Sequence, residues 1–249
     1  MRKKIVAGNW KMNLTFDEGR QLLNELRLLR LDDDKVEVIV APPSLYLSQF
    51  SFTNSNTLSL AAQNCHDKPS GAYTGEQSAA MLASLKIGYC ILGHSERRSM
   101  FHESDEWVAD KVMACFAEGV SPILCCGETL AEREAGRHFD VITKQLTTVF
   151  KRMDKKQAAY MIIAYEPVWA IGTGVTASSD QAQEMHAFIR SLISTELGRE
   201  EAEEMRILYG GSVKGSNAKE LFDQSDVDGG LVGGASLDFS SFKDIIDAI

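Results

Sequence analysis

Short, continuously apolar runs recur along the chain, and longer segments with amphipathic helical spacing separate them. Runs of this kind are typical of strands whose two faces are both covered, as in a parallel sheet. We predict eight such strands, at residues 4–8, 36–41, 58–62, 89–92, 122–125, 161–165, 207–209 and 230–232. The regular alternation of strand and helix therefore predicts a protein of the α/β class.

Polar residues mark the places where several of the intervening helices begin. The sequences Thr15-x-x-Glu18 and Asn217-x-x-Glu220 both have the capping-box pattern, in which two side chains satisfy the first free backbone N–H groups of a helix. Another helix is expected to begin near Ser178, after a stretch that contains two glycines. Each of these starts follows a predicted strand, as the alternation requires.

The number of repeating units narrows the fold class. Eight strand–helix units within 249 residues take about 31 residues each, near the size of one βαβ repeat. Parallel strands joined by helices form either an open doubly wound sheet or a closed barrel, and eight similar units fit the (β/α)8 barrel best. The polar run 199–204 is expected to be a solvated connection and not a domain linker, so residues 1–249 are predicted to form one domain.

Charge and cysteine content restrict the setting of the protein. The net charge of −9 argues against a general nucleic-acid or acidic-membrane surface, so an anionic ligand would need a local positive site. The cysteines are odd in number and include no Cys-x-x-Cys, which predicts reduced thiols in a reducing compartment. No signal peptide and no run near the ~20 apolar residues of a membrane helix is found, so we expect a cytoplasmic protein.

One stretch combines a buried strand with a carboxylate and an unusually apolar loop. The strand at 161–165 ends at Glu166, Pro167 cannot extend a sheet ladder, and the loop 168–171 is apolar although loops normally face water. Glycines follow the loop. The pattern is typical of a catalytic base under a lid. A capped strand with a loop buried against a neighbouring domain would explain the same residues.

Other chemically useful residues also follow the predicted strands. In a (β/α)8 barrel the active site lies at the carboxyl ends of the strands, and the last two loops commonly bind phosphate. The residues at these ends, besides Glu166, are Asn9, Lys11, His94, Glu96, Ser212, Gly233 and Gly234. Singly, each could be an ordinary surface, ion-pair or turn residue. Together they suit proton transfer beside a carbonyl in a phosphorylated substrate.

A competing nucleotide-binding motif does not fit its context. Residues 172–177 match the dinucleotide pattern G-x-G-x-x-A between a strand and a helix. Residues 166–171 separate this match from its strand, whereas the fingerprint requires a tight turn. The chain has no G-x-x-x-x-G-K-[ST] and no H-E-x-x-H, and Cys125-Cys126 lacks metal-ligand spacing.

Five motifs, spread in order along the whole chain, resemble those of the triosephosphate isomerase family: residues 9–13, 93–98, 164–174, 209–213 and 231–236. The resemblance implies a single catalytic domain with the TIM-barrel fold. It also implies interconversion of dihydroxyacetone phosphate and D-glyceraldehyde 3-phosphate through an enediolate, in glycolysis and gluconeogenesis, with no cofactor and no metal.

The resemblance also implies a role for each of five polar side chains. Glu166 would move the proton between two carbons, and His94 would act as a neutral electrophile toward the substrate oxygens. A helix that begins just after His94 would favour the neutral form, because its positive end opposes a second positive charge. Lys11 would stabilise negative charge, Asn9 would orient the oxygens, and Glu96 would support the network.

The same resemblance implies a phosphate grip, a lid and a partner. Backbone N–H groups of Gly172, Ser212, Gly233 and Gly234 would hold the phosphate. The lid and its apolar cover would comprise Pro167, Val168, Trp169, Ala170, Ile171, Thr173, Gly174 and Leu231. A homodimer is implied in which the arm at 63–76, with Thr74 at its tip, inserts beside the 9–11 loop of the other subunit.

Two other functions remain compatible with the residues alone. The first is a different barrel isomerase or epimerase acting on a phosphorylated sugar, which a metal requirement would favour. The second is a catalytically silent barrel kept as a binding protein, against which the intact set of Lys11, His94 and Glu166 speaks.

Overall fold

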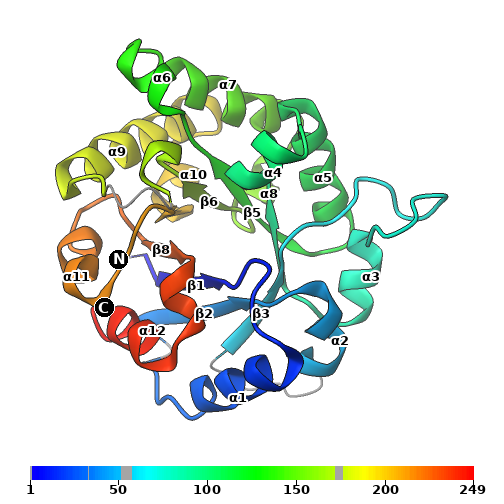
Figure 1. Cartoon of the computed structure of the whole chain (residues 1–249). Helices are drawn as coiled ribbons and strands as arrows, with labels where there is room; N and C mark the ends of the chain where they lie inside the picture. The colour runs from blue at the N-terminus through cyan, green and yellow to red at the C-terminus, as the bar shows by residue number, and fades with distance from the viewer. Residues whose placement is uncertain (1, 33, 52–57, 172–175) are drawn as a thin grey trace.

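Eight parallel strands hydrogen-bond in sequence order, and the last pairs with the first to close a barrel (Figure 1). The computed structural model describes residues 2–32, 34–51, 58–171 and 176–249. The strands are β1 (Lys4–Asn9), β2 (Val36–Ala41), β3 (Leu58–Ala62), β4 (Tyr89–Leu92), β5 (Ser121–Cys126), β6 (Ile162–Tyr165), β7 (Arg206–Tyr209) and β8 (Gly229–Val232). The prediction of a (β/α)8 barrel is confirmed, and each predicted strand lies within one or two residues of its observed bounds.

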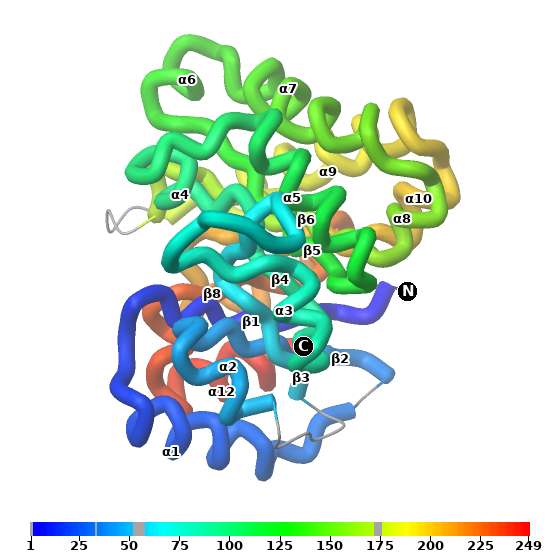
Figure 2. Tube along the Cα trace, turned by 90° about the vertical axis from the view of Figure 1, so that its right-hand side faces the viewer, coloured from blue at the N-terminus to red at the C-terminus, as the bar shows by residue number. Residues whose placement is uncertain are grey.

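Helices surround the barrel, which Figure 1 views along its axis and Figure 2 from the side, with the N-terminus at the end where the strands begin. They are α1 (Phe16–Leu26), α2 (Ser44–Ser51), α3 (Ala79–Ser84), α4 (Ser95–Met100), α5 (Asp105–Ala117), α6 (Leu130–Glu134), α7 (His138–Phe150), α8 (Lys155–Ala158), α9 (Ser179–Glu196), α10 (Arg199–Glu204), α11 (Gly215–Phe222) and α12 (Phe239–Ile246). Two short 3₁₀ helices, η1 (Val168–Ala170) and η2 (Gly234–Leu237), follow β6 and β8. No described helix is both long and apolar enough to cross a membrane.

Side chains of each strand alternate between two apolar cores. In β1, Ile5 and Ala7 belong to the cluster that fills the barrel, whereas Val6 belongs to the larger cluster between barrel and helices. Successive side chains of a strand point to opposite faces, so a strand buried on both faces must be apolar throughout. This is the physical reason for the continuous apolar runs in the sequence.

Two details of the predicted helices are corrected by the structure. The run 199–204, expected to be a solvated connection, forms helix α10, whose Ala202 is buried. Arg190 of α9 donates to the Ala202 carbonyl oxygen at 2.6 Å and so ties the two helices together. Asn217 does not begin a helix, because α11 begins at Gly215 and the Asn217 side chain accepts from the Lys214 N–H at 2.8 Å. The capping boxes at Thr15 and Ser178 are observed.

Candidate functional site

A cavity of about 300 Å³ opens at the carboxyl end of the barrel. Its wall is formed by residues at or just after the carboxyl ends of β1, β4, β6, β7 and β8. Nine of the residues predicted from the sequence line it: Asn9, Lys11, His94, Glu166, Ile171, Ser212, Leu231, Gly233 and Gly234. Segments far apart in the chain therefore bring an acid–base group, a cation and two glycine-rich loops to one concave site.

Glu166 is the buried carboxylate of this cavity. It directly follows β6, and only 2% of its surface is exposed. Its Oε1 lies 2.9 Å from His94 Nε2, and its Oε2 accepts a hydrogen bond from the Ser95 backbone N–H at 2.8 Å. Within the described residues, no lysine or arginine nitrogen lies within 4.0 Å of this carboxylate. Its charge is thus held by hydrogen bonds and not by a salt bridge.

Two glycines leave the space that Glu166 occupies. A Cβ added at Gly127 would lie 1.9 Å from the Glu166 carbonyl oxygen, and one added at Gly210 would lie 2.9 Å from its Cγ. On the side of Gly127, the backbone of Glu166 is held by its N–H, which donates to the Cys126 carbonyl oxygen at 2.7 Å. Any larger residue at either glycine would displace the carboxylate.

His94 caps the next helix and contacts the carboxylate through its other nitrogen. It is the N-cap of α4, and its Nδ1 accepts from the Glu96 backbone N–H at 3.2 Å. The proton of a neutral ring therefore resides on Nε2, from which it is donated to Glu166. Burial lowers the pKa of His94, but the carboxylates of Glu166 and Glu96 raise it by more, so the net direction is upward. The helix that was expected to favour the neutral ring does begin at Ser95, and the neighbouring carboxylates act on the pKa in the opposite direction.

Lys11 is held in an uncommon backbone conformation at the rim of the cavity. Its φ of 52° lies in the left-handed region, and its N–H donates to Asn9 Oδ1 at 3.0 Å. Its Nζ lies 2.6 Å from Glu96 Oε1. Strained backbone of this kind, fixed by local hydrogen bonds, is often found at functional sites. Glu96, the one predicted catalytic residue outside this cavity wall, thus contacts two residues that line it, Lys11 and His94.

The glycine-rich loops lie opposite the carboxylate. Ser212 follows β7, Gly233 follows β8 and Gly234 begins η2, so all three lie at strand ends that line the cavity. Backbone N–H groups in such turns can approach an anion closely. Lys214 also lines the cavity and was missed from the sequence. The sequence feature that could have identified it is its position, since it is a cation two residues after the Gly-Gly-Ser turn. Gly172, the fourth predicted phosphate residue, lies outside the described residues.

The first part of the predicted lid is anchored by a buried carboxylate. Val168, Trp169 and Ala170 form η1, directly after the buried Pro167. Trp169 Nε1 donates to Glu128 Oε1 at 2.8 Å, and the Tyr165 hydroxyl donates to the same oxygen at 3.0 Å. Glu128 follows β5 and is another residue whose role the sequence did not reveal.

The remaining lid residues divide into two groups. Ile171 and Leu231 both line the cavity, as the apolar cover requires. Thr173 and Gly174 lie outside the described residues.

The arm leaves the barrel between β3 and α3. Figure 1 shows it projecting beyond the ring of helices, and the tip residue Thr74 is exposed. A second cavity, of about 320 Å³, lies between the arm and the catalytic loops, with Lys11 and His94 in its wall together with Glu76 of the arm. The arm and the candidate active site are therefore neighbours within one subunit.

One group of side chains could hold a metal ion by proximity, and it lies elsewhere. In the described part of the chain, only one group of at least three His, Cys, Asp or Glu side chains has all its ligand atoms within 4.8 Å of one another. It consists of Cys65, Cys90 and Cys115. None of them lines the cavity that holds Glu166.

Comparison with known proteins agrees with this geometry. The family model described as triosephosphate isomerase matches residues 4–249. The chain is 51% identical to a triosephosphate isomerase of Porphyromonas gingivalis, with all of both chains covered. It is 52% identical to one from Bacteroides fragilis and 51% to one from Phocaeicola vulgatus, in each case over all of this chain and 99% of the relative.

Proposed function

The chain belongs to the triosephosphate isomerase family, and we propose on that premise that its 249 residues form one catalytic domain in which Glu166 is the base. The reaction is the interconversion of dihydroxyacetone phosphate and D-glyceraldehyde 3-phosphate, a step of glycolysis and gluconeogenesis. One observation carries the residue assignment. A buried carboxylate with no lysine or arginine partner among the described residues lies 2.9 Å from an imidazole nitrogen, in a cavity that Lys11 also lines.

Proton transfer between neighbouring carbons accounts for this arrangement. Glu166 removes a proton from the carbon beside the substrate carbonyl, and the electron pair moves onto the carbonyl oxygen to give an enediolate. His94 donates its Nε2 proton toward that oxygen and can receive one from the other oxygen. Glu166 then returns a proton to the neighbouring carbon. A positioned base of this kind contributes about 10²–10⁴-fold to the rate.

Movement of Glu166 links the base to the state of His94. In the present geometry the carboxylate contacts His94 and the Ser95 N–H, so it must turn to reach a substrate carbon. As it leaves, its upward effect on the pKa of His94 falls, and burial, which lowers that pKa, gains weight. The ring then favours its neutral form, which can donate from Nε2 while Nδ1 still accepts from the Glu96 N–H. Lys11 stabilises the negative charge that develops on the substrate oxygens, and Asn9 orients these oxygens.

Backbone amides are proposed to carry the phosphate. Ser212, Gly233 and Gly234, together with Gly172, supply N–H donors, and Lys214 adds a cation on the same side. Such a local positive site would allow a chain with a net charge of −9 to bind an anionic ligand. The lid 167–174 would close over the substrate, with Ile171 and Leu231 covering the base and excluding water.

A homodimer and a cytoplasmic location complete the proposal. Large apolar side chains are exposed around the second cavity and the arm: Met12 at 94%, Met100 at 69% and Phe101 at 59%. A partner's arm, with Thr74 at its tip, would cover them and lie beside Lys11. The five cysteines are free thiols, which suits a reducing compartment.

A coupled assay tests the activity and the base together. Enzyme treated with a chelator should interconvert the two triose phosphates, and Glu166→Asp, which withdraws the carboxylate by about 1 Å, should lower kcat by roughly 10²-fold or more with little change in KM. Lys11→Met should affect KM and kcat together. Full turnover in Glu166→Asp would exclude Glu166 as the base. Activity that depends on added metal would favour another barrel isomerase, and no turnover would favour a binding protein.

Sedimentation tests the dimer separately. The wild-type chain should sediment as a dimer, and Thr74→Arg should shift it toward monomers with lower kcat. A fully active monomer at assay concentrations would contradict the proposed insertion of the arm.

A further inference from the structure

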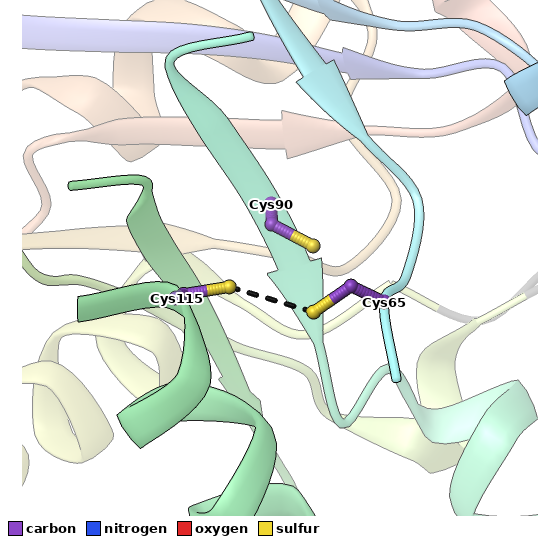
Figure 3. A group of neighbouring side chains, drawn as sticks. All are labelled: Cys65, Cys90 and Cys115. Carbon is purple, nitrogen blue, oxygen red and sulfur yellow. Dashed lines mark hydrogen bonds between the residues drawn. The ribbon is translucent and has the colours of Figure 1, made fainter. Parts of the chain in front are cut away.

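Three of the five cysteines meet behind the barrel wall, away from the proposed catalytic groups. Cys65 lies in the loop after β3, Cys90 in β4 and Cys115 in α5, and all three are 0% exposed. Their sulfur atoms all lie within 4.8 Å of one another, and Cys65 Sγ is 3.5 Å from Cys115 Sγ. Figure 3 shows the three side chains, from three separate elements, directed toward one another. The proposed isomerase chemistry uses none of them.

The spacing of the sulfurs suits a single bound ion. A metal–thiolate distance of about 2.3 Å, as zinc shows, would place three sulfurs of a planar triangle about 4.0 Å apart. The observed triangle has one edge at 3.5 Å and none above 4.8 Å. Movements of less than about 0.5 Å per sulfur would therefore complete the coordination.

The donor set selects a soft ion that accepts three ligands. Oxygen-seeking ions such as Mg²⁺ and Ca²⁺ are excluded by an all-sulfur site, and thiolates favour Cu(I), zinc or iron–sulfur clusters. Structural zinc sites and iron–sulfur clusters usually take four protein ligands, and this group offers three. We propose that Cys65, Cys90 and Cys115 form a buried three-coordinate site for one Cu(I) ion per chain.

A buried lysine ties together two of the segments that carry the cysteines. Lys111 of α5 is 0% exposed, and its Nζ donates to Asn64 Oδ1 at 3.0 Å, next to Cys65 in sequence, and to Glu103 Oε1 at 2.5 Å. Its charge is therefore paired within the protein, and its contact with Asn64 helps to hold the Cys65 loop beside the helix that carries Cys115.

Occupation of the site would stabilise the root of the arm. Cys65 is followed by His66, whose N–H donates to the Gln77 carbonyl oxygen at 2.8 Å and closes the base of the arm. An ion held by Cys65, Cys90 and Cys115 would join this base to β4 and α5. Because only the folded chain holds the three thiolates together, Cu(I) should bind it more tightly than the unfolded chain, and this difference in affinity raises the melting temperature.

The test measures Cu(I) binding directly, without reference to catalysis. Reduced protein, both native and refolded with Cu(I) under anaerobic conditions, is equilibrated with a competing Cu(I) chelator. We expect one tightly bound Cu(I) per wild-type chain, three sulfur neighbours at about 2.3 Å by X-ray absorption, and a higher melting temperature. Cys115→Ala should weaken binding by at least about 100-fold, because a thiolate ligand is lost.

Matched variants separate this site from other thiols. Cys126→Ala removes a buried thiol outside the group and should bind Cu(I) like the wild type. Equal binding by the wild type and Cys115→Ala would overturn the site, as would wild-type absorption spectra with two sulfur neighbours or a melting temperature lowered by Cu(I). If Cys115→Ala fails to fold, Cys65→Ala and the wild-type spectrum decide the question in the same way.

Discussion

The two ends of the barrel each hold a buried carboxylate, and the two carboxylates differ in the partners that bind them. Glu166 at the carboxyl end is 2% exposed, and Asp228 at the amino end, just before β8, is 1% exposed. Glu166 is held by the His94 ring and one backbone N–H. Asp228 has two arginine partners: Arg2 at 2.7 Å from Oδ1 and Arg190 at 2.7 Å from Oδ2.

The partners decide what each carboxylate can do. Asp228 also accepts from the Ile207 N–H at 2.9 Å, so three donors hold it in one position. A carboxylate bound in this way cannot turn toward a ligand without breaking two ion pairs. Glu166 has weaker restraints and faces a cavity, as a general base requires. Burial alone therefore does not mark a carboxylate as a candidate base, whereas a buried carboxylate that faces a cavity and has no lysine or arginine partner among the described residues is one.

Cavity size alone does not distinguish the two carboxylates. The cavity beside Asp228 measures about 480 Å³, larger than the 300 Å³ cavity beside Glu166. Its cations are already engaged by the protein, because Arg2 pairs with Asp228 and Lys4 Nζ donates to the carbonyl oxygens of Phe222 and Val227. The smaller cavity is the functional candidate because its polar groups converge on open space.

The largest expected effect is the loss of turnover in Glu166→Gln. The amide keeps the shape of the side chain but cannot accept the proton, so kcat should fall by roughly 10³-fold or more. The melting temperature should stay the same or rise, because a buried charge is removed. Steady-state kinetics and thermal unfolding measure both quantities. If the variant kept a tenth of wild-type kcat, or had a much lower melting temperature, Glu166 would have a structural role like that of Asp228.

Asp228→Asn should produce the opposite pattern. Two arginines would lose a buried counter-ion, so the free energy of unfolding should fall by about 3–5 kcal/mol. Per folded molecule, kcat should not change, because Asp228 lies at the far end of the barrel. Urea unfolding gives the first quantity and active-site titration the second. Normal stability with lost activity would break the contrast between the two ends.

A pH-dependent loss of stability should arise from His186 of α9. Burial lowers its pKa to about 4, and its only described hydrogen-bond partner is the Asp226 carbonyl oxygen, at 3.2 Å from Nδ1. The unfolded chain binds a proton near pH 6.5 and the folded chain does not, so stability is complete above pH 6.5 and falls toward pH 4. The loss attributable to His186 is up to about 3 kcal/mol.

Substitution of the ring isolates this contribution. In His186→Gln, unfolding free energies measured from about pH 7 to about pH 4 should fall less steeply than in the wild type. The exposed His102→Asn serves as the matched control and should keep the wild-type slope. A His186→Gln slope equal to that of wild type would show that the ring is protonated in the folded protein.

The smallest expected effect concerns a third buried carboxylate, Glu128. In its number of arginine partners it is intermediate between Glu166 and Asp228. It has an arginine partner, Arg133, at 3.1 Å, and it also accepts a hydrogen bond from Trp169 of the predicted lid. Trp169→Phe removes one indole donor and should cost about 1–2 kcal/mol of stability. Trp107→Phe removes a comparable bond, from Nε1 to Asp67 at 2.9 Å, and is the control. We expect kcat to fall in Trp169→Phe only; equal kinetics in the two variants would separate Glu128 from the lid.

The barrel and most of its candidate site could be predicted from the order of residues along the chain. Continuous apolar runs predicted all eight strands, because a strand covered on both faces has no polar positions to spare. The alternation of strands and helices then placed the residues after each strand at one rim, so Asn9, His94 and Glu166 could be grouped from their positions in the sequence. In the same way, local hydrogen bonding made the helix starts at Thr15 and Ser178 readable.

Which groups touch one another became clear only in the folded chain. The bond from the Ser95 N–H to Glu166, the anchoring of Trp169 by Glu128 and the meeting of three cysteines all join distant segments. Helix α10 was missed for the same reason, since its polar sequence has one buried residue, Ala202, and its packing on α9 supplies the rest. The direction of the His94 pKa also depends on distances to carboxylates, one of them from another segment. Electrostatic and packing energies depend on separation in space, which spacing along a chain does not encode.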